Sequence, residues 1–312
     1  LAWMAGAVME DLEFFQFHPT ALKFDGAPSF LISEALRGEG AVLVDSFGES
    51  PVDYLEGKDL ASRDQVSRAL FKAMQKQQVD HMGLDVKSIA LENIEARFPS
   101  IFQRCRELGL DPLNELIPVA PAAHYWMGGV ATNLKAATSI QGLFALGEVA
   151  STGLHGANRL ASNSLMECLV FANQMRNIEL NDCQTPKLLR DDSTFIQSNL
   201  RFSGDQGSKY LINEIENLRY LCWREAGVDR TQKGMSAALS KTTRDYKTLL
   251  QEPLLKLVFS QSKDEINRFD EIARRDLNLL LDLSNRQIAS SLMLEACLFR
   301  KESRGGHFRD DF

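Results

Sequence analysis

Imidazole and guanidinium side chains stand beside glycines or turns in several parts of the sequence, where they can converge on a ligand. The candidates are His18, His124, and the pair His155 and Arg159. Without cysteines or paired carboxylates at ligand spacing, such groups suit recognition of a substrate carboxylate better than metal binding. Each charge-assisted hydrogen bond contributes roughly 1.5–3 kcal/mol. A single histidine of this kind is more often structural, so the hypothesis depends on the combination.

Arg63 is a further candidate because of its predicted place at the start of a helix. Ser62-Arg-Asp-Gln65 has the form of a capping box, and apolar residues at helical spacing follow it. A cation is disfavoured at the N-terminus of a helix. Arg63 therefore indicates a functional role, although a solvated charge or a partner of Asp64 is the simpler alternative.

A third set of residues has the arrangement of an anion-binding turn. We expect a short buried strand at 142–148, then a glycine-rich loop, then a helix opened by a capping box at Ser164 and Glu167. A helix N-terminus after such a loop binds anions. Glu148, at the strand end, is placed to accept hydrogen bonds from the ribose of a dinucleotide.

The elements that must position these groups are a mixture of strands and helices. We expect a strand over 9–22 that Pro19 stops, a short helix in the segment from Phe30 to Gly40 that Gly38 ends, and a second helix over 89–98. The segment up to Asn114 then closes a modest α+β unit, which we interpret as a lid over a site.

The last third of the sequence reads as entirely helical. From Ser208 onward, apolar stripes at helical spacing predict three or four packed helices. The polar segment 183–207 is the best linker candidate. The stripes are Leu211, Ile215, Leu218 and Cys222; Ile266, Phe269, Ile272 and Ala273; and Ile288, Leu292, Ala296 and Phe299.

Composition excludes several classes of protein. A chain of 312 residues has room for about two domains, and its net charge of −7 offers no basic face for nucleic acid. No apolar run approaches the roughly 20 residues that cross a bilayer. The five cysteines are scattered, so no disulfide framework, zinc site or iron–sulfur site is predicted. We expect a soluble, cytoplasmic protein, or a plastid one if the source is eukaryotic.

Six motifs occur in the following order: Gln16-Phe-His-Pro-Thr20, Arg37-Gly-Glu-Gly40, Pro121-Ala-Ala-His-Tyr125 with Gly128-Gly129, Gly142-Leu-Phe-Ala-Leu-Gly-Glu148, His155-Gly-Ala-Asn-Arg-Leu-Ala-Ser-Asn-Ser-Leu165, and Glu302-Ser-Arg-Gly305 with His307. Through them the chain resembles the flavoprotein family of fumarate reductase, succinate dehydrogenase and L-aspartate oxidase. The segment 152–164 is most similar to the L-aspartate oxidase branch. The resemblance covers almost the whole chain.

The resemblance implies a role for each matching residue. It makes Arg63 the active-site arginine, and it implies that FAD is the cofactor. His18, His124 and Arg159 would bind substrate carboxylates, together with Ser33 and Glu34, where Ser33 departs from the usual threonine. The residues that would contact FAD are Glu148, Ser164 and Leu165.

The resemblance also implies a domain plan. Residues 1–17 would end the first part of the FAD-binding domain, 18–114 would form the substrate-capping domain, 115–182 would resume the FAD-binding domain, and 183–312 would form a C-terminal helical bundle. The chain opens at Leu1 and contains no G-x-G-x-x-G after a strand. We therefore expect a C-terminal fragment that lacks the Rossmann-type half, and that holds no FAD and is inactive when isolated.

The expected reaction is oxidation of L-aspartate to iminoaspartate by hydride transfer to flavin, the first step of de novo NAD synthesis. Oxygen or fumarate would reoxidise the flavin, and quinolinate synthase is a candidate partner. Because arginine stays protonated at neutral pH, Arg63 would act as an electrostatic clamp in aspartate oxidation and as a proton donor in the fumarate direction. Two alternatives stay open: a fumarate reductase or succinate dehydrogenase flavoprotein subunit, and an inactive truncated module.

Overall fold

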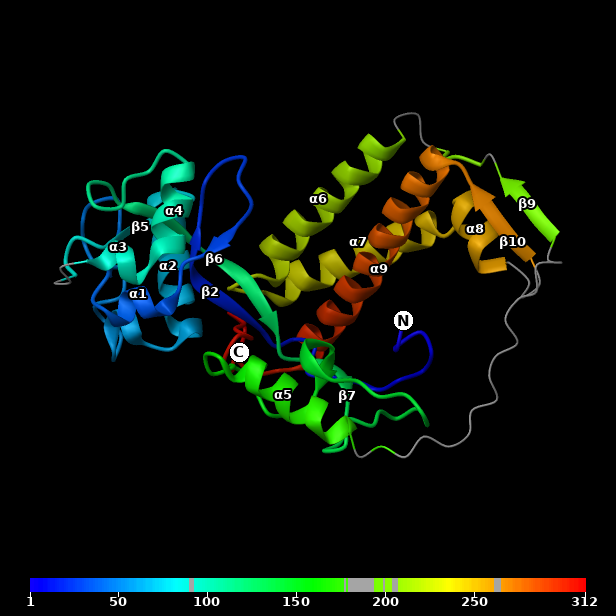
Figure 1. Cartoon of the computed structure of the whole chain (residues 1–312), viewed down its shortest axis with the longest axis horizontal. Helices are drawn as coiled ribbons and strands as arrows, with labels where there is room; N and C mark the ends of the chain where they lie inside the picture. The colour runs from blue at the N-terminus through cyan, green and yellow to red at the C-terminus, as the bar shows by residue number, and fades with distance from the viewer. Residues whose placement is uncertain (90–92, 177, 179–193, 199, 204–206, 261–264) are drawn as a thin grey trace. The chain divides into compact units, whose positions relative to one another are not determined.

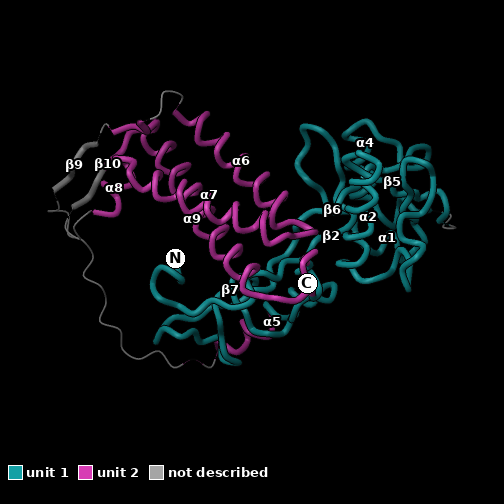
Figure 2. Tube along the Cα trace, turned by 180° about the vertical axis from the view of Figure 1, so that it is seen from behind, with its two compact units in different colours: residues 1–168, 304–308 teal, residues 169–303, 309–312 magenta. Residues whose placement is uncertain are grey.

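Two units make up the described part of the chain. The computed structural model describes residues 1–89, 93–176, 178, 194–198, 200–203, 207–260 and 265–312. Unit 1 comprises Leu1–Cys168 and Arg304–Phe308, and unit 2 comprises Leu169–Ser303 and Arg309–Phe312 (Figure 2). Strands and helices are mixed in the first and helices dominate the second, which confirms an α+β protein with a C-terminal helical region. The finer domain boundaries remain predictions.

An antiparallel sheet with the order β3-β2-β6-β5-β4 is the largest sheet of unit 1. Its two longest strands, β2 (Phe15–Leu22) and β6 (Ile117–Trp126), run side by side (Figure 1). The shorter strands are β3 (Phe30–Leu31), β4 (Val42–Val44) and β5 (Met82–Asp85).

The pairing of β2 with β6 changes register on both sides of His18. The first shift leaves His124 as one extra residue on β6, and the second leaves one extra residue on β2 beside Pro19. Bulges of this kind bend a strand and re-aim its side chains. A bulge also tolerates the missing N–H of proline. The expectation that Pro19 ends the strand is therefore wrong, and residues 9 and 10 belong to a separate strand.

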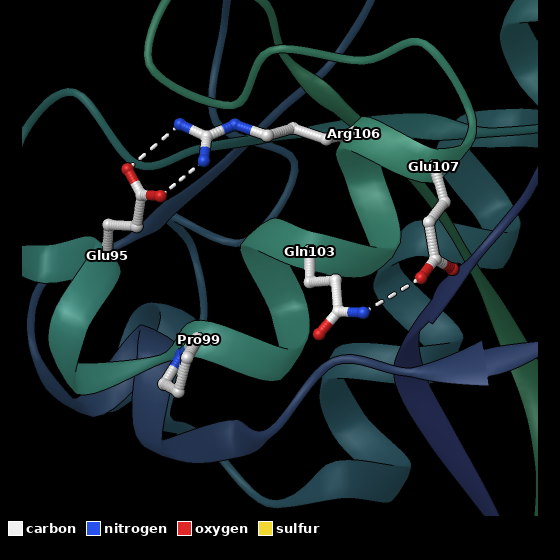
Figure 3. Close-up of a pocket in the computed structure, with 5 residues that line it drawn as sticks. All are labelled: Glu95, Pro99, Gln103, Arg106 and Glu107. Atoms are coloured by element: carbon white, nitrogen blue, oxygen red, sulfur yellow. Dashed lines mark hydrogen bonds and ion pairs between the residues drawn. The ribbon is translucent and has the colours of Figure 1, made fainter.

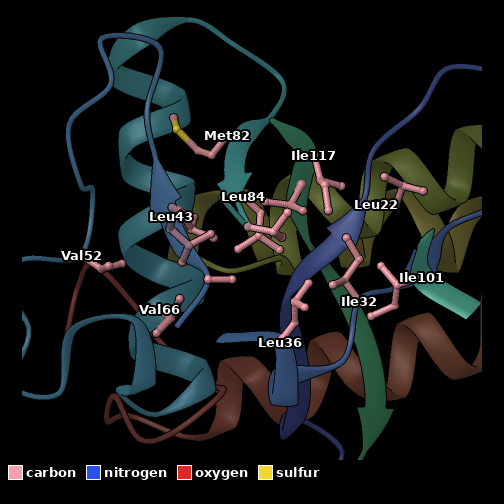
Figure 4. Close-up of a cluster of buried hydrophobic side chains, with 14 of the residues drawn as sticks. Leu22, Ile32, Leu36, Leu43, Val52, Val66, Met82, Leu84, Ile101 and Ile117 are labelled. Atoms are coloured by element: carbon pink, nitrogen blue, oxygen red, sulfur yellow. The ribbon is translucent and has the colours of Figure 1, made fainter. Parts of the chain in front are cut away.

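Buried aliphatic side chains fill the space between this sheet and the surrounding helices (Figure 4). Leu43, Leu84 and Ile117 from three strands meet Val66 and Leu70 from one helix, all almost fully buried. Burial of each such side chain stabilises the fold by about 1.5–3 kcal/mol. The core thus fixes the helix that begins at Arg63 against the sheet.

The helices of unit 1 match their predicted positions unevenly. Helix α2 (Arg63–Gln77) begins where predicted, but the capping box is wrong: Ser62 Oγ donates to the Asp64 carboxylate at 2.6 Å and caps no backbone N–H. The predicted helix from Phe30 is only α1 (Glu34–Gly38). The predicted helix over 89–98 is α3 (Ile94–Arg97), with α4 (Pro99–Glu107) after it. Residues 90–92 lie outside the described residues.

A second, three-stranded sheet of unit 1 has the order β1-β7-β8. It comprises β1 (Met9–Glu10), β7 (Gly129–Ala131) and β8 (Ala150–Ser151), and α5 (Asn163–Met175) follows. The strand predicted over 142–148 is reduced to one antiparallel bridge between Phe144 and Ala137, and Gly142 and Gly147 at its two ends have φ values of 80° and 75° that an extended strand excludes. Gly147 instead opens the 3-10 helix Gly147–Val149.

Unit 2 contains the predicted helices. They are α6 (Ser208–Ala226), α7 (Gln232–Leu249), α8 (Pro253–Ser260) and α9 (Glu271–Phe299), of which α6, α7 and α9 pack together (Figure 1). The expectation of an entirely helical region is wrong, because β10 (Glu265–Phe269) pairs in parallel with β9 (Thr194–Ser198). Five residues are too few for apolar spacing to distinguish a strand from a helix. Of the predicted linker, 183–193, 199 and 204–206 lie outside the described residues.

The buried face of α9 is offset from the predicted stripe. Ala273 of the predicted stripes is fully buried, but Ile272 is 53% exposed and Phe299 88% exposed, and the other side chains that pack inward include Leu280, Leu283 and Leu294. A 29-residue helix carries apolar residues on more than one face, so the spacing alone did not identify the buried one.

Arg309 closes the C-terminal end of α9. Its guanidinium donates to the backbone oxygens of Cys297 and Leu298 at 3.2 Å and of Arg300 at 2.9 Å. The last carbonyls of a helix have no partner within the helix, and a cation at this end is favoured. Arg309, itself almost fully buried, therefore satisfies the end of the longest helix.

Replacement of Arg309 by alanine should destabilise unit 2 by roughly 2–4 kcal/mol, because buried carbonyl groups lose their donor. Urea unfolding and hydrogen exchange of the α9 amides measure this change. Arg286→Ala is the matched control, because Arg286 forms an exposed pair with Asp282 on the same helix. Equal effects of the two substitutions would show that Arg309 has no capping role.

Candidate active site

Five of the predicted site residues lie together in unit 1, near the side chain of Gln16: His18, Glu34, Arg63, His124 and Arg159. Arg63 Nη1 and Arg159 Nη2 both donate to Gln16 Oε1, at 2.8 and 3.1 Å. Gln16 is buried, and it shares strand β2 with His18. Sequence reasoning missed Gln16, although polar residues alternating with phenylalanines in an otherwise buried strand were a usable signal.

The rings of His18 and His124 meet edge to face, with centroids 5.5 Å apart. His18 is buried, and its Nδ1 accepts from the backbone N–H of Thr20 at 3.3 Å. Burial, reinforced by the nearby positive charge of Arg63, lowers the pKa of His18 from 6.5 to about 3. Burial and Arg159 likewise lower the pKa of His124. Both imidazoles are therefore neutral at physiological pH.

Glu34 is the carboxylate that pairs with Arg63. Its Oε2 lies 2.8 Å from Nε and 2.7 Å from Nη2 of Arg63, and its Oε1 lies 3.7 Å from Nη2 of the buried Arg37. Glu34 thus lies between two arginines. The adjacent Ser33 is exposed, and its hydroxyl accepts from the Ala35 N–H as the N-cap of α1. That cap is the contact the structure shows for Ser33.

Arg159 is a buried cation, 5% exposed, that forms no ion pair with any carboxylate among the described residues. Its guanidinium carbon lies 4.5 Å from the centre of the Tyr125 ring, and Nη1 donates to Ser164 Oγ at 3.2 Å. Its Nε has no hydrogen-bond partner. Burial and the charge of Arg63 lower the pKa of Arg159. A buried guanidinium without a carboxylate is costly unless an anion completes the site.

A buried carboxylate, Glu167, contacts the hydroxyl of Tyr125, the residue whose ring Arg159 faces. It accepts from Thr152 Oγ1 at 2.6 Å and from Tyr125 Oη at 3.3 Å, and it lies 2.8 Å from His155 Nε2. The predicted capping box of Ser164 and Glu167 is therefore wrong, since Glu167 faces these side chains and α5 already begins at Asn163. His155 also belongs to this network and not to the cluster around Gln16.

The predicted flavin contacts lie at an exposed part of unit 1. The Glu148 carboxylate is exposed and accepts from the backbone N–H of Trp126 at 2.9 Å. A Cβ on Gly129 would stand 2.3 Å from the oxygen of Val149, so this glycine lets the turn that carries Glu148 approach β7. Leu165 is 70% exposed beside the start of α5. A free acceptor near uncovered aliphatic side chains fits the ribose and ring of FAD.

The hollow on unit 1 beside α3 and α4 is a different place (Figure 3). It is lined by Pro99 and by side chains that already pair with one another: Arg106 with Glu95, and Gln103 with Glu107. None of the predicted site residues lines it. We therefore place the candidate site at the Gln16 cluster.

Among the described residues, no group of three or more histidine, cysteine, aspartate or glutamate side chains is arranged to hold a metal ion. Within the same residues, no helix has the length and apolar character needed to cross a bilayer.

Two family models match the chain. The model of the FAD binding domain matches residues 1–165, and the model of the fumarate reductase flavoprotein C-term matches residues 215–312. The chain is 44% identical over 322 residues to L-aspartate oxidase from Nostoc sp. and 44% identical over 326 residues to L-aspartate oxidase from Synechocystis sp.. These alignments cover 100% of the chain and 55% and 57% of the two relatives. The chain thus spans about half the length of the curated relatives it matches.

A solved structure titled "Quinol-Fumarate Reductase with Menaquinol Molecules" is also similar. It superimposes with a TM-score of 0.77 at 26% identity, covering 99% of this chain and 55% of that one.

His18 should stay neutral as the pH is lowered from 8 to 5, because burial and Arg63 oppose its protonation. The unfolded chain takes up this proton near pH 6.5, so the stability that neutral His18 contributes is complete above pH 6.5 and declines as the pH falls toward 3. Imidazole ¹⁵N chemical shifts measure the titration, and Arg63→Gln should raise the pKa. Protonation of His18 near pH 6.5 in the folded protein would contradict this account.

Proposed function

Because this chain belongs to the FAD binding domain family, we propose that it forms the substrate pocket and part of the flavin site of an L-aspartate oxidase. Relatives with that name match the chain over its whole length. The reaction is oxidation of L-aspartate to iminoaspartate. FAD is the cofactor of the family, and when bound it accepts the hydride that leaves Cα of the substrate.

The buried, carboxylate-free guanidinium of Arg159 is the observation that supports this function most directly. Arg63 and Arg159 both donate to Gln16 Oε1, so two positive charges lie at one acceptor. Glu34 pairs with Arg63 but not with Arg159. The site therefore has an excess of positive charge. A diacid substrate would supply the missing negative charges, with each charge-assisted hydrogen bond contributing roughly 1.5–3 kcal/mol.

We assign the two ends of the substrate to different groups. Arg159, with neutral His18 and His124 as hydrogen-bonding groups, binds carboxylate oxygens, and Arg63 contacts the reacting end. Arg63 stabilises developing negative charge as a clamp in aspartate oxidation, and it donates the proton when fumarate is reduced. Glu34 orients Arg63 through Nε and Nη2. Ser33 is a weaker candidate, because its hydroxyl caps α1.

The proposed flavin contacts are Glu148, Ser164 and Leu165. Glu148 would accept hydrogen bonds from ribose hydroxyls, and Ser164 and Leu165, which lie at the start of α5, would contact the ring. Oxygen or fumarate reoxidises the cofactor. The product would enter de novo NAD synthesis as its first intermediate, with quinolinate synthase as the candidate partner, and the proposed location is the cytoplasm.

A second candidate is a fumarate reductase or succinate dehydrogenase flavoprotein subunit. It is favoured by the match of residues 215–312 to the fumarate reductase flavoprotein C-term and by the similarity to a quinol-fumarate reductase structure. Assays of the complete polypeptide with L-aspartate and with succinate as reductant separate the two. Turnover of succinate without turnover of aspartate would overturn our choice.

A third reading, an inert module, is tested by a flavin absorbance scan of the purified 312-residue chain. We expect no bound flavin in this isolated chain, and a stable yellow protein would refute the inert reading.

Arg63→Leu in the complete polypeptide should lower turnover by roughly 10²–10³-fold or more, because a charge that stabilises the transition state is lost. The flavin should stay bound, since Arg63 contacts Gln16 and Glu34 and none of the proposed flavin residues. Steady-state kinetics and the flavin spectrum measure the two effects. Arg104→Leu, which removes an arginine paired with Glu107 on α4, is the control. Retained activity would remove Arg63 from the mechanism.

A further inference from the structure

We propose that Asp64 and Asn158 are positioning residues whose mutual hydrogen bond holds Arg63 and Arg159 at the separation that a diacid requires. This inference rests on the proposed function of the same site. Neither residue belongs to the set that we assign to substrate or flavin.

The two residues are the direct chain neighbours of the two arginines. Asp64 follows Arg63 in the first turn of α2, and Asn158 precedes Arg159 in the loop before α5. Asn158 Nδ2 donates to Asp64 Oδ1 at 2.8 Å. Because Asp64 and Asn158 adjoin the two arginines in the sequence, the hydrogen bond between them sets the distance between the backbone segments that carry the two guanidinium groups.

The same asparagine is also bonded to the acceptor that the arginines share. Gln16 Nε2 donates to Asn158 Oδ1 at 2.9 Å and to the Arg159 backbone oxygen at 2.6 Å, while Gln16 Oε1 accepts from both guanidinium groups. The amide of Asn158 therefore uses its donor toward Asp64 and its acceptor toward Gln16. This orientation fixes Gln16 and, through it, both arginines.

Asp64 also accepts from two groups that do not reach the substrate cluster, one at the oxygen that Asn158 uses and one at the other oxygen. Ser62 Oγ donates to Asp64 Oδ1 at 2.6 Å, and Arg68 Nη2 donates to Oδ2 at 3.0 Å. Arg68 in turn donates to the backbone oxygen of Gly305 at 3.0 Å, and it lies 5.1 Å from the centre of the Phe308 ring. The Asp64 carboxylate, which accepts from Asn158, is thus fixed in direction as well as in position.

The Asp64–Asn158 hydrogen bond opposes the electrostatic repulsion between the two arginines. Both guanidinium groups donate to Gln16 Oε1, and burial together with the positive charge of Arg63 lowers the pKa of Arg159. Without an opposing restraint, two like charges in a partly buried site separate until solvent screens them. The Asp64–Asn158 bond keeps both charges in place before a diacid arrives, so less reorganisation is needed on binding.

A selective loss of diacid recognition is therefore the expected result of breaking this bond. Displacement of the arginines should weaken the binding of succinate, a diacid whose two carboxylates contact both of them. The binding of butyrate, a monoacid of the same length, should be weakened less. The ratio of the two inhibition constants, measured on the complete flavin-loaded polypeptide, reports positioning separately from folding or cofactor content.

Asn158→Asp should weaken succinate relative to butyrate by about tenfold or more, because two carboxylates then face each other where a hydrogen bond stood. The exchange Asp64→Asn with Asn158→Asp should restore the ratio to within about threefold of wild type, since the bond reforms with donor and acceptor reversed and the net charge is unchanged. If Asn158→Asp does not fold, Asn158→Ala gives the same comparison without an added charge.

Asp45→Asn is the matched control. Asp45 in unit 1 accepts from Gln77 Nε2 at 2.7 Å and from the backbone N–H groups of Phe47 and Glu49, so it loses comparable bonds away from the arginines. An unchanged ratio in folded Asn158→Asp, or no recovery in the folded exchange variant, would overturn the positioning role. Failure of the wild type to bind succinate or oxidise aspartate would instead overturn the proposed function.

Discussion

Gln16 Oε1 accepts a hydrogen bond from each of two guanidinium groups, and the candidate site depends on this shared acceptor. One amide oxygen cannot neutralise two positive charges, and Glu34 pairs with Arg63 but not with Arg159. The neighbouring imidazole of His18 adds no further charge, because burial lowers its pKa to about 3. The cluster therefore carries a surplus of positive charge, which lies on Arg159 because that guanidinium forms no ion pair among the described residues.

This cluster is assembled from segments that are far apart in the sequence and that one sheet and one helix bring together. Strand β2 carries Gln16 and His18, and the bulge on β6 adds His124. The apolar core beneath α2 holds Arg63 at its first turn. Strands β2 and β6 and helix α2, which have their own packing, thus fix Gln16, His18, His124 and Arg63, whereas Arg159 is carried by the loop before α5.

Local spacing predicted much of the architecture and which side chains could gather, and non-local pairing explains what it missed. The start of α2 at Arg63 and the helices of unit 2 follow from periodicity and end signals. Bulges in β2 and β6 depend on the register between two strands, which no spacing within one strand reveals. For the same reason Glu167, which meets residues 12 to 42 positions away, looked like a local helix cap.

Residues 304–308 belong to unit 1, although the whole of 169–303 separates them from its other part. On the ribosome, the N-terminal part of unit 1 emerges long before the segment that completes it. The backbone N–H of Gly306 donates to the Ala157 oxygen at 3.0 Å, one residue from Asn158. The loop that carries Arg159 therefore gains this support only late in translation, so premature termination before residue 304 leaves unit 1 unfinished as well as unit 2.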